Sequence, residues 1–243
     1  MAAAAYRLPA MDQDFLLGDT TRGLRFQLEY QKAEEHLREW GVATTVIVFG
    51  SARVRPGEKN GWYDAAREFA RICSEEGGAK IAHNGPRQNV IATGGGPGIM
   101  EAANRGAHDA GAPSIGFNIT LPMEQEPNAY STPDLTFRFH YFAMRKMHFA
   151  IRAAALVVFP GGFGTMDELF EILTLRQTGK MDDNLPVVLL DSAFWKSLVN
   201  FRHFADTGLV AAKDLDLFGF ADTPRQAWEQ LLRRGLKVPG AKA

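Results

Sequence analysis

The chain has 243 residues, of which 46% are hydrophobic and 23% charged, and its formal net charge at pH 7 is −1. These values are typical of a globular protein that is long enough to bury a core without disulfides or a structural metal. A nearly neutral chain has no broad basic surface, so binding to nucleic acid or to an anionic membrane is not expected.

The cysteine content and the first residues bear on the compartment. A single cysteine, Cys73, excludes an intrachain disulfide and a multi-cysteine metal site, and its place in an apparent helix predicts a small buried side chain. The opening segment MAAAAYRLPAMDQDF lacks a basic region followed by a long apolar run, so no signal peptide is predicted. No apolar stretch reaches the roughly 18 residues of a membrane span. The expected compartment is the cytoplasm.

Residues 1–41 are predicted to form a polar helical arm. In the stretch RGLRFQLEYQKAEEHLREW, the apolar residues Leu24, Leu28, Leu37 and Trp40 recur at near-helical spacing among many charges, and Gly41 is a typical helix stop. Such an arm could pack on its own domain or on a second subunit. Residues 42–243 are then expected to form one further domain.

Apolar strands alternate with helices through the rest of the chain. Strands are predicted at 43–50, 89–96, 114–119, 135–142, 155–162 and 186–191, and helices at about 62–76, 99–111, 143–153, after 162, and 194–207. Continuous apolar strands between helices indicate a parallel sheet covered on both faces. The expected fold class is therefore α/β: a doubly wound, Rossmann-like parallel sheet with helices on both faces, plus the N-terminal helical arm.

The first glycine cluster, Gly94-Gly95-Gly96-Pro97-Gly98, lies between a predicted strand and a predicted helix. Glycines at such a turn allow close approach of the backbone to a ligand, and the start of a helix favours an anion. A tight turn with no ligand is the plainer interpretation. The third glycine of the dinucleotide fingerprint is replaced by Ile99, which argues against an NAD(P)-dependent oxidoreductase.

The second cluster, PGGFGTMDE at 160–168, repeats the same arrangement of buried strand, glycine turn and helix. Ligands of open α/β sheets bind outside the carboxyl ends of the strands, so the two turns can face each other across a crevice. Thr165 and Glu168 also fit the T-x-x-E pattern of a helix capping box, which is a purely structural alternative.

The segment PGGFGTMDE resembles the P-G-G-x-G-T-x-x-E signature of the LOG family, the cytokinin-activating phosphoribohydrolases whose older members were labelled lysine decarboxylase-like. The resemblance extends through Gly50-Ser51, GGGPGIMEAA and the Arg145-Lys146 pair, and covers roughly residues 43–195. It implies hydrolysis of a nucleoside 5′-monophosphate to free base and ribose 5-phosphate. It also implies a dimer that completes the active site, so we expect a homodimer or a multiple of dimers.

The resemblance also assigns site residues. It implies that Arg145 and Glu168 are catalytic and that the glycines and Thr165 hold the phosphate. A carboxylate in the loop after the third strand corresponds to Glu124, with Glu126 as the alternative. The candidate substrate-binding residues are Ser51, Gly94, Gly95, Gly96, Gly98, Glu124, Lys146, Gly161, Gly162, Gly164, Thr165, Asp167 and Glu171.

The chain also departs from the family pattern. Compact members lack the N-terminal arm, the insert at 77–88 lengthens one connection, and Glu101 stands where the family has a glycine. These features resemble those of the longer bacterial members. The preferred base (adenine or an N6-modified adenine) is not fixed by these residues.

The chemistry of N-glycosidic cleavage suits the two catalytic candidates. A carboxylate such as Glu168 can stabilise the oxocarbenium-like sugar or position water. Arg145 is too basic for an ordinary acid and is better suited to hold the leaving base or the sugar. His140 and His148 are expected to be structural or solvent-facing.

No metal or cofactor is needed, and no lysine in a recognisable pyridoxal phosphate site supports decarboxylation. The alternative function is a non-catalytic nucleotide or molybdenum-cofactor carrier of the same fold, against which the retention of both Arg145 and Glu168 argues.

Overall fold

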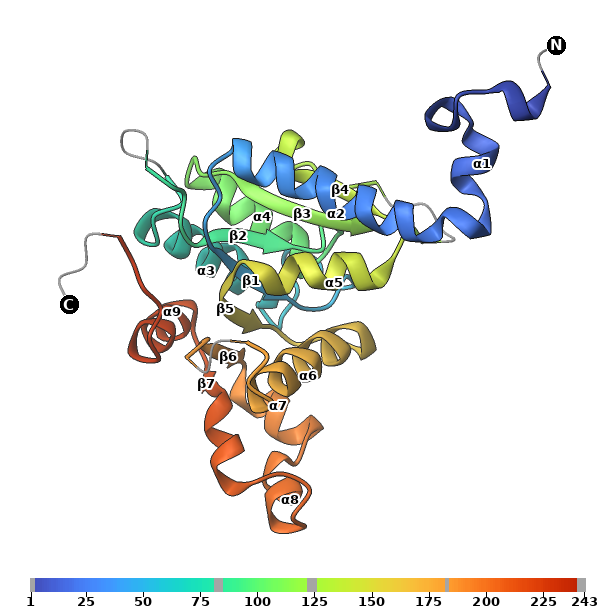
Figure 1. Cartoon of the computed structure of the whole chain (residues 1–243). Coiled ribbons are helices and arrows are strands. Elements are labelled where there is room, and N and C mark those ends of the chain that lie inside the picture. The colour runs from blue at the N-terminus through green and yellow to red at the C-terminus, as the bar shows by residue number, and fades with distance from the viewer. Residues whose placement is uncertain (1–2, 81–84, 122–125, 182–183, 240–243) are drawn as a thin grey trace.

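The computed structural model describes residues 3–80, 85–121, 126–181 and 184–239. Within these ranges seven strands form one all-parallel sheet in the order β4-β3-β2-β1-β5-β6-β7 (Figure 1). The strands are β1 (Thr45–Phe49), β2 (Val90–Thr93), β3 (Ser114–Ile119), β4 (Thr136–Phe139), β5 (Ala153–Val158), β6 (Val187–Leu190) and β7 (Gly219–Ala221). The predicted doubly wound α/β fold is confirmed.

Helices cover both faces of this sheet, and α1 (Gln13–Leu17) stands apart from it. The others are α2 (Arg22–Glu39), α3 (Trp62–Glu76), α4 (Ile99–Asp109), α5 (Phe142–Ile151), α6 (Phe163–Gln177), α7 (Ser192–Leu198), α8 (Phe201–Asp206) and α9 (Pro224–Arg233). One apolar cluster joins the sheet to α2, α5 and α6, and a second joins it to α3, α4 and α9. Strands β1, β2, β5 and β6 contribute buried residues to both clusters, which is why their sequences are apolar almost throughout. Strands β3 and β4 contribute only to the first cluster and alternate apolar with polar or small residues.

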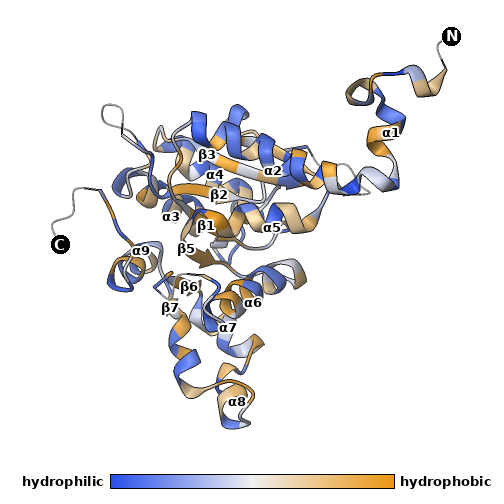
Figure 2. Cartoon of the chain, in the orientation of Figure 1, coloured by the Kyte–Doolittle hydropathy of each residue, from blue (hydrophilic) through white to orange (hydrophobic). Residues whose placement is uncertain are grey.

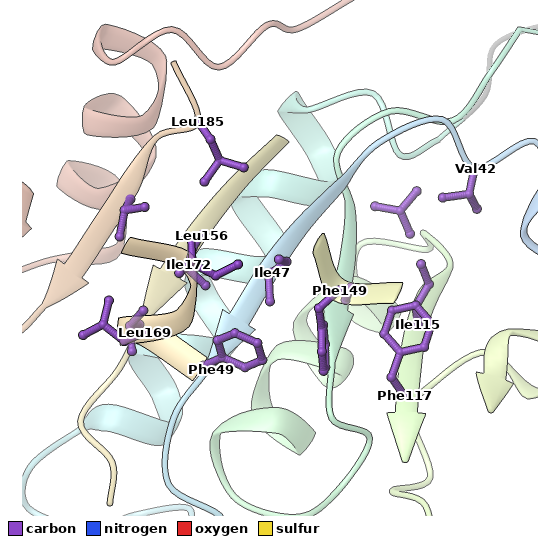
Figure 3. Close-up of a cluster of buried hydrophobic side chains, with 14 of the residues drawn as sticks. Val42, Ile47, Phe49, Ile115, Phe117, Phe149, Leu156, Leu169, Ile172 and Leu185 are labelled. Atoms are coloured by element: carbon purple, nitrogen blue, oxygen red, sulfur yellow. The ribbon is translucent and has the colours of Figure 1, made fainter. Parts of the chain in front are cut away.

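Strand β1 shows how the two clusters share one strand. Ile47 and Phe49 belong to the first cluster, whereas Val46 and Val48 belong to the second, as the two-residue period of a strand requires. Figure 3 shows Ile47 and Phe49 beside Phe149 of α5 in the first cluster. Colouring by hydropathy likewise places apolar residues along β1 and β2 at the centre of the molecule (Figure 2). Cys73 is fully buried in the second cluster, as predicted, and burial raises the pKa of its thiol.

The carboxyl-terminal third differs from the prediction in two ways. The single helix expected at 194–207 is two helices, because the side chain of Asn200 caps a new helix start by accepting from the N–H of His203. Strand β7 and helix α9 were not predicted. Strand β7 has only three residues, whereas α9 begins with a recognisable signal, the capping Thr223 followed by Pro224.

The N-terminal arm has two distinct parts. Helix α2 ends as predicted, with Gly41 in the left-handed conformation at a φ of 64°. The apolar residues of the expected stripe differ in burial. Leu37 is completely buried in the first cluster, whereas Leu24 and Leu28 are 49% and 59% exposed. Helix α1 projects away from the rest of the molecule (Figure 1). No helix in the described ranges is long and apolar enough to span a membrane.

Candidate active site

The site lies at the carboxyl edge of the sheet, where the strand order reverses. After β1 the chain adds β2, β3 and β4 on one side, and then β5 on the other side of β1. Such a switch point is where open α/β sheets bind ligands. The loops after β1 and β5 are joined by a hydrogen bond from the Ser51 N–H to the Pro160 carbonyl oxygen, at 3.0 Å. A cavity of about 280 Å³ lined by Ser51, Trp62 and Gly161 opens between them.

The first glycine turn approaches the catalytic candidate Arg145. Gly95 and Gly98 have φ values of 69° and 73°, which explains glycine there by turn geometry alone. Gly94 has no such φ, but a Cβ at this position would overlap the Nη2 atom of Arg145. Gly94 therefore makes room for the guanidinium, and the plain-turn interpretation accounts for only part of the cluster.

Helix α6 begins at the second glycine turn, two residues before Thr165, which the capping-box alternative takes as the N-cap. The helix starts at Phe163 with Gly162 as its N-cap and has no side-chain cap, so Thr165 and Glu168 do not form a capping box. A Cβ on Gly161 would overlap the side chain of Thr165, which is buried. The first N–H bonded within the turn is that of Met166, to the Gly162 carbonyl. The preceding amides are thus free of helical acceptors and suited to an anion.

Arg145 and Glu168 form a buried ion pair between α5 and α6. Arg145 Nη1 lies 3.6 Å from Glu168 Oε1, and the two side chains are 11% and 14% exposed. Arg145 Nε donates to the Phe117 carbonyl oxygen at the end of β3, at 2.7 Å. Burial raises the pKa of Glu168 to about 7, although the Arg145 charge opposes the shift. Glu168 can therefore change its protonation state near neutral pH, as a general base or acid requires.

Lys146, the neighbour of Arg145, forms ion pairs with two further candidates on α6. Lys146 Nζ lies 2.8 Å from Asp167 and 3.0 Å from Glu171. Burial alone would lower the pKa of Lys146, but its two carboxylate partners raise it overall. A lysine held as a cation in this way is poorly suited to form a Schiff base.

The structure says less about the two acidic candidates in the loop after β3. Glu124 lies outside the described residues. Glu126 lines a separate cavity of about 460 Å³ together with Asn118. Asn118 was not predicted: it lies against Gly95, and its Nδ2 is buried with no hydrogen-bond partner among the described residues. The only sequence signal for it is an amide at the end of an apolar strand. Glu101 accepts a hydrogen bond from Tyr63 at 2.7 Å, which explains its departure from glycine.

Comparison with a family model covers the second glycine turn and the Arg145–Glu168 pair, and begins just after the first glycine cluster. The family model described as "Possible lysine decarboxylase", which represents the LOG proteins, matches residues 100–231, more than half of the chain. The chain belongs to the LOG family. Helices α5 and α6 lie inside the matched region, so the LOG match includes both Arg145 and Glu168.

Curated relatives of this LOG chain are enzymes. A cytokinin riboside 5′-monophosphate phosphoribohydrolase of Arabidopsis thaliana is 26% identical over 72% of this chain and 76% of its own length. A probable enzyme of the same name from Oryza sativa subsp. japonica is 27% identical over 72% of this chain and 67% of its own length. The molybdenum cofactor binding protein of Rippkaea orientalis shares the fold, with a TM-score of 0.52 and 21% identity over 78% of this chain and 94% of its own.

Proposed function

We propose that the protein hydrolyses the N-glycosidic bond of nucleoside 5′-monophosphates, AMP among them, to give the free base and ribose 5-phosphate. The observation that carries the proposal is the buried Arg145–Glu168 pair, in which the carboxyl has a pKa of about 7, beside glycine turns suited to a phosphate. The phosphoribohydrolase activity of the curated relatives supports it. The scheme uses no metal and no cofactor.

Each part of the pair has a role in the proposed reaction. The ribosyl C1′–N bond breaks while positive charge develops on the sugar, and ionised Glu168 stabilises that charge or orients the attacking water. Water adds to C1′ as a hydroxyl group, and the proton that the water gives up ends on the leaving base. Arg145 stays charged at neutral pH and steadies the leaving base or the sugar by hydrogen bonds. Phosphate held at the glycine turns fixes the sugar against both residues.

The first prediction concerns the phosphate. We expect kcat/KM for AMP to exceed that for adenosine by about 10²-fold or more, because binding energy at the remote phosphate orients the reacting bond. Released base is measured with a panel of nucleosides and their mono-, di- and triphosphates, including N6-prenylated AMP. Equal kcat/KM values for AMP and adenosine would remove phosphate anchoring from the proposal. Tight binding of a nucleotide with no release of base would favour the carrier function.

A second prediction concerns the assembly state, for which we propose a homodimer or a multiple of dimers. The arm exposes 85% of Tyr6, 72% of Leu8, 79% of Met11 and 71% of Leu17, next to the half-exposed Leu24 and Leu28 of α2. Apolar surface of this extent is typical of a protein interface. Light scattering at micromolar concentration should give at least twice the 26.8 kDa of one chain. The mass of a single chain contradicts the prediction.

A further inference from the structure

Helix α5, which carries Arg145 and Lys146, is held at its start by a residue from the N-terminal arm. Its N-cap residue, Tyr141, supplies no side-chain cap. Instead Glu29 of α2 accepts from two consecutive backbone amides, His140 N–H at 2.9 Å and Tyr141 N–H at 3.3 Å. A carboxylate at a helix N-terminus also interacts favourably with the helix dipole. The start of α5 is thus fixed by a residue more than a hundred positions earlier in the chain.

Two more residues of α2 hold Tyr141 itself. Arg25 Nε donates to the Tyr141 hydroxyl at 2.9 Å, and the ring of Phe26 packs edge-on against the Tyr141 ring, with 4.4 Å between centroids. Arg25 also donates to the carbonyls of Leu16 and Gly18, so the same guanidinium ties α1 to this point. Tyr141 is one helical turn before Arg145, whose N–H donates to the Tyr141 carbonyl at 3.2 Å.

The far end of α5 is held by a second carboxylate of α2. Arg152, the C-cap residue of α5, donates to both oxygens of Glu34, and its Nε donates to the Val42 carbonyl at 3.1 Å. Glu34 is 4% exposed, and the hydrogen bond from Arg152 lowers its pKa. Between the two ends the ring of His148 stacks on Tyr30 of α2, with 5.4 Å between centroids.

We propose that Glu29 and Glu34 of α2 are positioning residues, which clamp the two ends of α5 so that Arg145 faces Glu168. Neither carboxylate contacts Arg145 or Glu168; both act through the backbone and the end residue of α5. Glu168 lies on α6, so a shift of α5 alone changes the 3.6 Å separation within the pair. In its effect on turnover the inference rests on the function proposed above, but the geometry of Arg145 can be observed independently.

The test compares Glu29→Ala with Glu29→Gln and Glu35→Ala. Glu35 is the matched control, an exposed glutamate of the same helix whose carboxylate accepts from Gln31. We expect Glu29→Ala to lower kcat for AMP about 10- to 100-fold with little change in KM, because a small displacement of a catalytic group has effects of this size. Glu29→Gln should recover only part of the activity, since its amide oxygen replaces one of the two acceptor oxygens and its NH2 group cannot accept the second N–H. Glu35→Ala should match the wild type.

A double-substitution cycle separates positioning from general destabilisation. In a protein that already carries Arg145→Ala, Glu29→Ala should cause no further loss of kcat, because Glu29 acts through Arg145. A second readout is the Arg145 Nε–H signal in the NMR spectrum of arginine-labelled protein, assigned by its absence in Arg145→Ala. This signal should shift or broaden in Glu29→Ala and in Glu34→Ala, and stay in place in Glu35→Ala.

The outcomes distinguish failure of the inference from failure of the proposed function. Full additivity in the cycle, or an unmoved Arg145 signal in folded Glu29→Ala, would overturn the positioning role. Absence of base release by the wild-type protein would overturn the proposed function, and the NMR comparison would still decide whether α2 positions Arg145.

Discussion

Glu168→Gln is expected to lower kcat for AMP by about 10²-fold or more, equivalent to about 3 kcal/mol of lost transition-state stabilisation. The amide is nearly isosteric but neutral, so it cannot stabilise the developing charge on the sugar. Because Glu168 does not cap α6, the change removes no helix cap. AMP should still bind, since the glycine turns are intact. Turnover and equilibrium AMP binding of the variant are the measurements.

The same substitution is expected to stabilise the protein at alkaline pH. The pKa of Glu168 in the folded state, about 7, lies above the ordinary value of 4.5. Between these values the folded state holds a proton that the unfolded chain has lost, so stability falls as pH rises from 4.5 to 7 and remains reduced above it. Glutamine removes this dependence. Glu168→Gln should therefore gain about 1–3 kcal/mol over the wild type at pH 8, and little at pH 4.5.

Kinetics over pH give a further check on Glu168. If its ionised form acts, wild-type kcat/KM should fall as pH drops below about 7, and the residual activity of Glu168→Gln should lose that limb. A folded Glu168→Gln protein with near-wild-type turnover would contradict the catalytic role and favour the carrier function.

Arg145→Ala is the second substitution with a large expected effect, a loss of about 10²-fold or more in kcat, with an added rise in KM if the guanidinium also binds the ground state. It removes the cation that opposes the raised pKa of Glu168. The pKa of that carboxyl should rise further above 7, and the acid limb of the remaining activity should move to higher pH. A pH profile with an unmoved acid limb would mean that the two side chains are not coupled.

Gly94→Ala is expected to displace the guanidinium of Arg145 without removing it. The added methyl group would overlap Arg145 Nη2 and Met100 Sδ, and because both atoms lie near the ends of flexible side chains, the two side chains can move aside. Activity should therefore fall while the protein stays folded, as judged by its melting temperature. Wild-type activity in this variant would mean that Arg145 need not lie against the glycine turn.

Much of this fold could be predicted because its strands are local, continuous apolar runs such as residues 45–49, followed by glycine turns. Arg145 and Glu168 are assigned through the family resemblance and not by composition or spacing, and their contact with each other is a finding of the structure. Glu29 and Glu34 could not be found this way, because their charges on a polar helix are indistinguishable from those of exposed Glu35. Their roles depend on contacts with α5, which local sequence does not encode.

The clamp of α2 on α5 has a consequence for the order in which the site is assembled. The Glu34–Arg152 pair joins residues 118 positions apart, and the contact between Glu29 and Tyr141 spans 112 positions. During synthesis α2 leaves the ribosome long before its partner helix exists, and such distant contacts form late because closing a long loop is entropically costly. A chain interrupted before α5 therefore leaves Glu29 and Glu34 without their partners at the two ends of that helix. Arg145 gains this support from α2 only after the chain has been made as far as Arg152.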